Sequence, residues 1–371
     1  MAKQNKPAIR FKEFTDAWEQ RKLGALCVEF KSGDFISASD IAENEAYPVY
    51  GGNGLRGFTN HYNHDGEYAL IGRQGALCGN VNYAVGKSYF TEHAVAVRAN
   101  KTNQTRFLYY LFSTMNLGQY SGQSAQPGLA VGNLVELENV VPSKPEQEKI
   151  ASFLSSLDNL ITLHQRKYDK LQVLKKAMLE KMFPKNSSGV PEIRFKGFTD
   201  AWEQRKAKDL CSISTGKSNT QDRVDDGIYP FYVRSPIVEH SNRYLFDEEA
   251  VLTVGDGVGT GKVFHYVNGK YDLHQRVYRM FDFSEEITAK YFYYYFSNHF
   301  YDRVMAMTAK TSVDSVRYEM IADMDIALPK VKEQMAISAY FDRLDHLITL
   351  HQRELEKLQN IKKSMLEKMF V

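Results

Sequence analysis

The chain has 371 residues, enough for two or three domains that each bury a core of their own. Charged residues make up 25% of it and hydrophobic residues 43%, which is ordinary for a soluble globular protein. The formal net charge of +2 does not point to a nucleic-acid partner, so that function would need a local basic surface.

The sequence also disfavours two further classes, disulfide-stabilised secreted proteins and membrane proteins. Cys27, Cys78 and Cys211 are odd in number and lack metal-ligand spacing, so we expect reduced thiols, with a disulfide as the less favoured alternative. The first six residues lack the apolar core of a signal peptide, and no apolar run reaches the length of about 18 residues that a membrane span needs. We therefore expect a soluble, cytoplasmic protein.

Two blocks of the sequence occur twice. Residues 9–22 (IRFKEFTDAWEQRK) return at 193–206 with one change in 14, at an offset of 184. Residues 160–166 (LITLHQR) return unchanged at 347–353, at an offset of 187. The chain is therefore two tandem units, and this repeat governs the prediction of its fold.

The first unit opens with a block that mixes aromatic and charged residues around Phe11, Phe14 and Trp18. We expect this block to pack each unit against a long helix, and a surface segment is the alternative. Between residues 23 and 141, short β-like runs alternate with glycine-rich turns, which predicts a mixed α/β globule. Residues 106–115 (RFLYYLFSTM) predict a buried helix, and residues 135–141 predict a final strand.

The second unit repeats this plan with different loops. Residues 229–232 match 47–50, and VGDG at 254–257 matches IGRQ at 71–74. The glycine-rich GGNG at 51–54, however, aligns with VRSP at 233–236, which is not glycine-rich. One scaffold is therefore expected to carry two different surfaces.

A long helix is predicted after each globule, from about residue 144 and from about residue 331. Each helix carries a seven-residue repeat of apolar residues and one histidine, which indicates a coiled coil. The predicted seam comprises Ile150, Leu154, Leu157, Ile161, His164, Leu171 and Met178 in the first copy, and Ile337, Phe341, Leu344, Ile348, His351, Leu358 and Met365 in the second. A helix that packs only on its own globule is the alternative.

The predicted fold is mixed α/β (α+β), with two globular domains joined by two long helices that pack as an antiparallel coiled coil in a pseudo-twofold tandem repeat. The expected segments are the first domain (1–143), the first long helix (144–183), a linker (184–190), the second domain (191–330) and the second long helix (331–371).

No catalytic, metal-binding or cofactor motif emerges from the sequence. Residues 254–263 (VGDGVGTGKV) come nearest to a phosphate loop, but Asp256 replaces a required glycine and Val263 replaces the Ser/Thr that would bind magnesium. A turn of the duplicated fold is the preferred interpretation. His93 and His274 sit at matching places in the two units, either as catalytic groups or, preferably, as hydrogen-bonding or phosphate-contacting residues. These negative results favour a recognition protein.

At this point the whole chain resembles the specificity (S) subunits of bacterial type I restriction–modification enzymes. The resemblance rests on FTDAWE at 198–203, YPVYGGNG at 47–54, LIGRQG at 70–75 and PEQEKIA at 145–151. The last is answered by KEQMAI at 332–337, which lacks the proline.

The resemblance implies a non-catalytic protein of bacterial defence. Its two target-recognition domains would each bind one half of a bipartite, asymmetric site in double-stranded DNA. The subunit would hold two adenine-specific methyltransferase (M) subunits, and two restriction (R) subunits would complete the complex. It would bind no cofactor itself, because S-adenosylmethionine, ATP and Mg²⁺ belong to those partners.

Polar residues on the glycine-rich loops are the expected DNA contacts, since Arg pairs with guanine, Asn or Gln with adenine, and Lys or Ser with phosphate. For each residue, an ordinary solvated loop position is the alternative. The candidates are Asn53, Arg56, Arg73, Gln74, Gln123, Ser124 and Gln126 in the first unit, and Lys217, Arg234, Ser235, Asp256, His274, Lys310 and Ser312 in the second.

Two other functions stay open at this stage. A stand-alone two-domain DNA-binding regulator would use the long helices only as spacers. An enzyme would need a site around His93 and His274.

Overall fold

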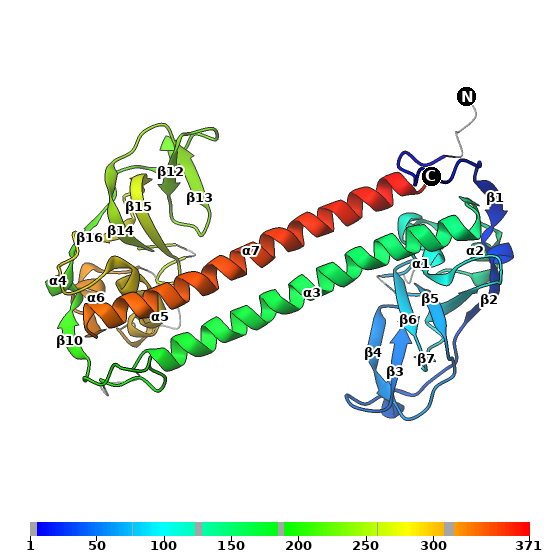
Figure 1. The fold of residues 1–371 in the computed structure, drawn as a ribbon, viewed down its shortest axis with the longest axis horizontal. Helices are drawn as coiled ribbons and strands as arrows, with labels where there is room; N and C mark the ends of the chain where they lie inside the picture. Colours follow the sequence, from blue (N-terminus) through cyan, green and yellow to red (C-terminus); the bar gives the residue numbers. More distant parts are fainter. Residues whose placement is uncertain (1–5, 76, 123–127, 185–188, 258, 308–314) are drawn as a thin grey trace. The chain divides into compact units, whose positions relative to one another are not determined.

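The computed structural model describes residues 6–75, 77–122, 128–184, 189–257, 259–307 and 315–371. The chain divides into two compact units, the first formed by residues up to 165 together with 353–371 and the second by residues 166–352. Each unit therefore contains one globule and a part of both long helices (Figure 1).

The globule of the first unit is built on three small sheets. The largest is antiparallel and has the strand order β2-β8-β5-β6, formed by Cys27–Ser32, Ala94–Ala99, Glu67–Gly72 and Val81–Val85. A second has the order β4-β3-β7, formed by Gly54–Thr59, Tyr47–Gly51 and Tyr89–Phe90, with β3 and β7 parallel. The third pairs β1 (Glu19–Lys22) with β9 (Glu138–Val141).

The globule of the second unit repeats this arrangement but joins two of the sheets into one. Its six-stranded sheet has the order β11-β16-β14-β15-β12-β13, formed by Ser212–Thr215, Val277–Phe281, Phe246–Val254, Phe264–Leu273, Tyr229–Tyr232 and Val238–Ser241. The single long strand β15 runs where the first unit has β6 and β7, which connects the two parts of the sheet. β10 (Glu203–Lys206) pairs with β17 (Asp325–Leu328).

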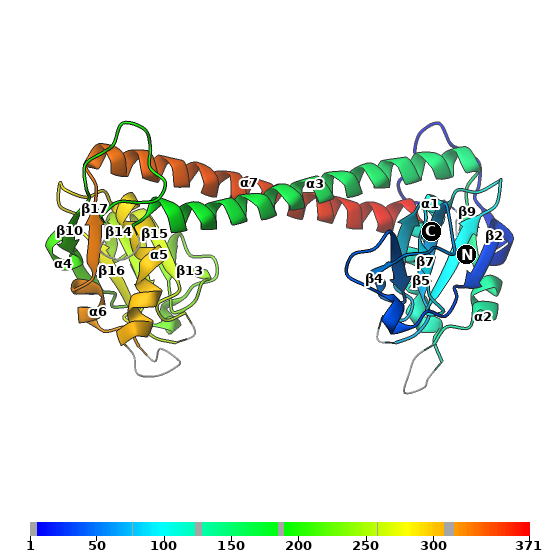
Figure 2. The same cartoon turned by 90° about the horizontal axis from the view of Figure 1, so that it is seen from below.

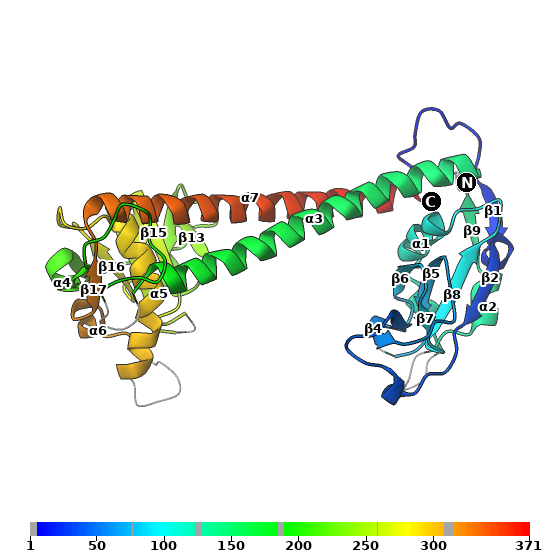
Figure 3. The ribbon, with the colours of Figure 1, turned by 60° about the horizontal axis from the view of Figure 1, so that its bottom comes forward.

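One aromatic helix lies in the core of each globule. α1 (Thr105–Thr114) confirms the buried helix predicted from the sequence, with Phe107, Leu108 and Leu111 almost fully buried. Its counterpart α5 (Ala289–Met307) continues further (Figure 3) and packs on β14 and β15. Shorter helices, α2 (Val131–Glu136), α4 (Ala207–Leu210) and α6 (Tyr318–Ala322), lie beside these cores. The predicted strand at residues 135–141 is wrong at its start, because Val135 and Glu136 complete α2.

The two long helices are α3 (Lys144–Met182) and α7 (Val331–Met369). In the first unit the end of α7 packs beside α1 (Figure 2), and the ring of Phe370 stacks on that of Phe107. In the second unit Phe183, directly after α3, stacks on Phe341 of α7. The start of each helix thus packs with the end of the other, and the predicted antiparallel pairing is confirmed. Helices confined to their own globules are excluded.

The predicted seam residues are buried or half-buried along these helices. Ile150, Leu154 and Leu157 belong to the core of the first unit, with Leu358 and Met365 packed against it. Ile337, Phe341 and Leu344 belong to the core of the second unit, with Leu171 and Met178 packed against it. Ile348 is buried, and Ile161, His164 and His351 are half-buried. Each core is therefore shared by a globule and both helices.

The duplicated opening blocks fix the globules to the helices. Arg10 Nε and Nη2 donate to Glu146 Oε1 and Oε2, both at 2.7 Å. In the second unit Arg194 holds Glu333 in the same way at 2.7 and 2.8 Å. Trp18 Nε1 lies 3.4 Å from Glu146 Oε1 and its ring is buried. The expectation that these blocks pack against the long helices is confirmed.

Candidate nucleic-acid interface

Three loops of the second unit meet at one place. Arg234 follows β12, Asp256 follows β14, and Arg276 lies between β15 and β16. Asp256 Oδ1 lies 3.5 Å from Arg234 Nη1, and its Oδ2 lies 3.7 Å from Arg276 Nε. The two arginine side chains are 49% and 65% exposed, so this loop triad presents two guanidinium groups to solvent.

The same three positions meet in the first unit, where they are Gly52, Gln74 and His93. A Cβ atom on Gly52 would lie 3.1 Å from the carbonyl oxygen of His93 and 3.3 Å from that of Gln74. Glycine at residue 52 therefore allows the three loops to approach closely, whereas the second unit has Arg234 there. The first loop triad carries an amide and an imidazole in place of the carboxylate and the guanidinium groups.

Equivalent backbone hydrogen bonds establish these correspondences. Arg73 N donates to His93 O at 2.9 Å, and Gly255 N donates to Arg276 O at 2.8 Å. Arg73 therefore corresponds to Gly255, and the sequence match of 254–257 with 71–74 is wrong by one residue. His93 corresponds to Arg276, so its match with His274 is wrong by two.

His274 instead corresponds to Thr91. The ring Nδ1 of His274 accepts from Arg276 N at 3.0 Å, and the hydroxyl of Thr91 accepts from His93 N at 3.3 Å. The preferred interpretation, a hydrogen-bonding histidine, thus holds for His274. Burial lowers the pKa of His274, assisted by the nearby charge of Arg234. The ring is 4% exposed and supports the turn that carries Arg276.

The glycine-rich segment near residue 257 is a turn present in both units. Thr260 N donates to Gly257 O, as Cys78 N donates to Gly75 O in the first unit. Gly257 and Gly75 have φ angles of 86° and 89°, a conformation that favours glycine. The prediction of a structural turn is confirmed.

The other predicted contacts of the first unit surround its loop triad. Asn53 and Arg56 are exposed at the β3–β4 hairpin. The stem of Arg56 crosses Gly51, whose added Cβ would lie 2.5 Å from Arg56 Cδ. Arg73 is half-buried, and its Nη1 donates to Ser32 Oγ at 3.3 Å, so it links two strand ends. Gln123, Ser124 and Gln126 lie outside the described residues.

In the second unit Lys217 is exposed after β11, and Ser235 is half-buried beside Arg234. The Ser235 hydroxyl bonds the backbone of Ile237 at 3.2 Å and therefore shapes the hairpin. Lys310 and Ser312 lie outside the described residues. The segments that follow the undescribed parts do reach the loop triads, since Gly128 pairs with Gln74 and Ser315 pairs with Asp256.

Two exposed arginines were missed by the sequence analysis. Arg276 completes the second loop triad. Arg243 Nη2 donates to Ser218 Oγ at 3.1 Å, and the same guanidinium pairs with Asp222 and Asp272. An alignment of Thr91 with His274 would have placed Arg276 opposite His93. The sequence comparison instead matched His93 with His274, because both are histidines, and this shifted the alignment by two residues.

Other kinds of site find little support in the part of the chain that the structure describes. It contains no group of three or more metal-binding side chains and no helix both long and apolar enough to cross a membrane. All three cysteines are free thiols, and burial raises the pKa of Cys27 and Cys211 to about 12. Both are therefore protonated at neutral pH.

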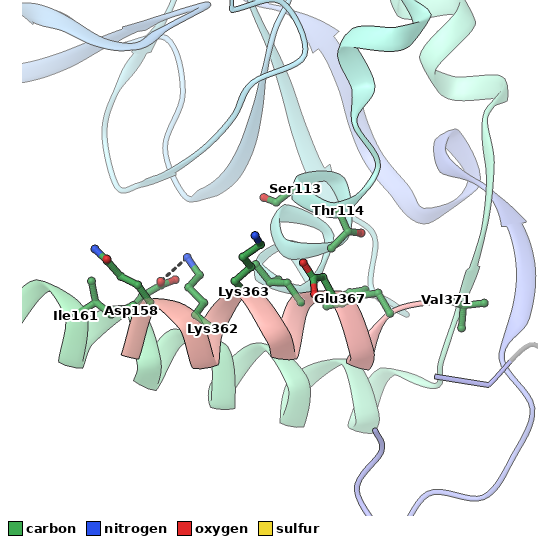
Figure 4. Close-up of a pocket in the computed structure, with 11 residues that line it drawn as sticks. Ser113, Thr114, Asp158, Ile161, Lys362, Lys363, Glu367 and Val371 are labelled. Atoms are coloured by element: carbon green, nitrogen blue, oxygen red, sulfur yellow. Dashed lines mark ion pairs between the residues drawn. The ribbon is translucent and has the colours of Figure 1, made fainter. Parts of the chain in front are cut away.

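An open groove of about 740 Å³ lies in the first unit, away from its loop triad. It is lined by the end of α1 and by the paired helices, including Thr114, Asp158, Lys362 and Lys363 (Figure 4). The Lys362–Asp158 ion pair crosses one end of it. None of the predicted DNA contacts that lie within the described residues lines this groove.

The fold and its loop triads define a duplicated recognition protein, and comparison with known proteins supplies its family. Residues 15–173 and 199–360 match the family described as the type I restriction modification DNA specificity domain, once in each unit. The chain belongs to this family. It is a specificity (S) subunit of a type I restriction–modification system and thus a non-catalytic component. A stand-alone regulator and a separate enzyme are therefore set aside.

Individual relatives agree with this assignment. The chain is 44% identical over 156 residues to the type I restriction enzyme EcoprrI specificity subunit of Escherichia coli, a match that covers 41% of this chain and only 39% of that relative. It is 26% identical over 306 residues to the MjaVIII specificity subunit of Methanocaldococcus jannaschii, covering 73% and 71%. The crystal structure of an S subunit from M. genitalium shares the fold, with a TM-score of 0.80, 15% identity and 99% of each chain covered.

Proposed function

We propose that the chain recognises a bipartite, asymmetric sequence in double-stranded DNA, with one half-site bound by each unit. The observation that best supports this proposal is the pair of loop triads. Equivalent positions on one scaffold hold Gly52, Gln74 and His93 in one unit and Arg234, Asp256 and Arg276 in the other. Because amide and guanidinium groups pair with different bases, the two half-sites are expected to differ in sequence.

The long helices are the proposed spacer between the half-sites. Both α3 and α7 contribute residues to each compact unit, so their length limits how far apart the two loop triads can act. Four residues inserted in each helix, after Arg166 and after Arg353, add about 6 Å at about 1.5 Å per residue. The tolerated spacing should then grow by one or two base pairs, at about 3.4 Å each, with both half-site sequences unchanged.

The proposed protein partners are two methyltransferase subunits, one on each copy of the repeated helix surface. Leu163 and Leu350 occupy equivalent places in the repeat and are 46% and 44% exposed, which offers the same apolar contact twice. Two restriction subunits would join this complex. S-adenosylmethionine, ATP and Mg²⁺ would be bound by those partners, and genomic DNA as substrate would place the complex in the cytoplasm.

Two measurements test this proposal. Co-expression with a type I methyltransferase subunit should yield a complex of two such subunits with one copy of this chain. Sequencing of methylated adenines in a genome that carries both should then reveal two short, different half-sites with a fixed spacer. A single continuous motif, or a stable complex with one methyltransferase subunit, would contradict it.

A further inference from the structure

The second loop triad places two cations around one anion at the surface. Asp256 is only 24% exposed and lies between Arg234 and Arg276, so its carboxylate reduces the repulsion between the two guanidinium groups. An isolated exposed arginine samples many rotamers, and a carboxylate partner restricts that freedom before any ligand binds. The arrangement therefore suits recognition by two preoriented arginines.

The atoms that face Asp256 leave other donors available. Arg276 approaches Asp256 most closely through Nε, which lies 3.7 Å from Oδ2, so the end-on pair of N–H groups, one from each of Nη1 and Nη2, is not part of this contact. A guanidinium can present two such N–H donors side by side, which matches the O6 and N7 acceptors of guanine in the major groove. Arg234 approaches Asp256 through Nη1 and retains Nε and Nη2 for the same purpose.

The support beneath Arg276 is also built into the fold. Its backbone N–H is held by the buried ring of His274, and its carbonyl oxygen accepts from Gly255 N at 2.8 Å. The residue is thus fixed at the backbone while its side chain is 65% exposed. A side chain that served only to stabilise the fold would have little reason for this exposure.

The first unit provides an internal comparison. Its backbone makes the equivalent hydrogen bonds, but Gly52, Gln74 and His93 replace the two arginines and the aspartate. The charged residues are therefore not required by the scaffold, which folds with either set. Their presence in one unit alone points to the ligand of that unit.

We propose that Arg234 and Arg276 read guanine bases in the half-site bound by the second unit, and that Asp256 is the positioning residue that orients both. This inference rests on the proposed function and deepens it by assigning a base class to named residues. The first half-site is read through Gln74 and its neighbours and does not depend on these three side chains.

The test uses the full chain in complex with its methyltransferase subunits and measures the recognised motif by sequencing methylated adenines. It also measures binding to duplexes that differ at one base pair. Arg276→Ala and Arg276→Lys should each reduce the preference for guanine at one position of the second half-site by roughly 10- to 100-fold. Lysine keeps the charge but cannot bind guanine through the same planar pair of donors, so it should fail as alanine does.

The positioning role of Asp256 has its own signature. Asp256→Asn removes a negative charge that faces DNA, so affinity for non-specific duplexes should hold or rise while the preference for guanine falls. The matched control is Arg205→Ala. Arg205 lies in β10 of the same unit, where it pairs with Glu203 and Glu286. The motif of this variant should stay unchanged.

The outcomes separate the inference from the function on which it rests. Rescue by Arg276→Lys, or equal weakening on all sequences, would assign Arg276 to phosphate and overturn the inference. An unchanged second half-site in Asp256→Asn would overturn the positioning role. If the wild-type complex shows no bipartite motif at all, the proposed function itself fails. An intact first half-site in each variant shows that the complex has folded.

Discussion

Lys175 of α3 and Asp345 of α7 form an ion pair, with Nζ and Oδ1 2.5 Å apart. The hydroxyl of Tyr294, from the globule, donates to Oδ2 of the same aspartate at 2.9 Å. The first unit repeats all three partners, because Lys362 pairs with Asp158 at 2.5 Å and Tyr110 donates to that aspartate at 2.7 Å. One polar contact thus joins both long helices to the globule in each unit.

This contact makes a stability prediction. Lys175→Ala should lower the free energy of unfolding by about 1 kcal/mol, because the ion pair is only partly exposed and Asp345 loses its cation. Lys176→Ala is the matched control, since Lys176 is the next residue on α3 and is exposed. Urea denaturation measures both variants. Equal stability of the two variants would show that the ion pair contributes nothing.

The buried carboxylate at the start of each long helix gives a larger effect. Glu146 is 1% exposed, and its two carboxylate oxygens accept from Nε and Nη2 of Arg10. Arg10→Ala therefore leaves a buried carboxylate without its cation. We expect a loss of about 3–5 kcal/mol in the free energy of unfolding, measured by urea denaturation.

The corresponding control is Arg21→Ala. Arg21 pairs with Glu19 on the surface, where both side chains are more than half exposed, so its loss should change stability by less than about 0.5 kcal/mol. If Arg10→Ala proved as mild as this control, the buried pair would not be what holds the opening block on α3.

The long helices, and the packing of the opening blocks on them, could be predicted from the sequence because their residue patterns repeat. A seven-residue period of apolar residues and two near-identical copies leave few alternatives to paired helices. The opening block was predicted to pack on them because it mixes aromatic and charged residues and occurs in two near-identical copies. Its main polar contact, Arg10 with Glu146, was not predicted, since nothing local links residues 136 positions apart.

The loop triads could not be predicted from the sequence, for a different physical reason. Loop residues are placed by backbone hydrogen bonds of the surrounding strands, and those bonds carry no residue signature. His93 and His274 were therefore matched by identity, although the hydrogen bonds pair His274 with Thr91. Arg234 and Asp256 were each predicted from the sequence as candidate DNA contacts, whereas their convergence with Arg276 required the fold.

The exchange of Thr91 for His274 between the units makes a pH prediction. Nδ1 of His274 must be unprotonated to accept from Arg276 N, and burial lowers the pKa of this ring. Arg234 and Arg276 lower it further, while Asp256 and Asp222 act in the opposite direction. The contribution to stability is therefore complete above the unfolded pKa, about 6.5, and is lost as the pH falls below it.

His274→Thr replaces the ring with the hydroxyl that the first unit uses. Between pH 7.5 and 5.5 the variant should lose less stability than the wild type, by at most about 1.4 kcal/mol, which is the limit for one proton over the pH unit below 6.5, as measured by urea denaturation at each pH. His64, His265 and His299, whose pKa values burial also lowers, are present in both proteins and cancel in the difference. Parallel pH profiles would refute this account. His240→Thr, at an exposed position, is the control.

Gly72 controls the approach of the first loop triad and provides the last prediction. A Cβ atom there would lie 2.3 Å from the carbonyl oxygen of Gly52 and 3.0 Å from that of Leu77, so the β3–β4 hairpin must shift. Gly72→Ala should cost about 1–3 kcal/mol and weaken recognition of the first half-site, with the second half-site retained in the methylation map. Gly132→Ala, which has open space in α2, should instead raise stability by about 0.5 kcal/mol and leave both half-sites intact. Retention of both half-sites in Gly72→Ala would mean that the close approach of Gly52 to its neighbours is not needed for recognition.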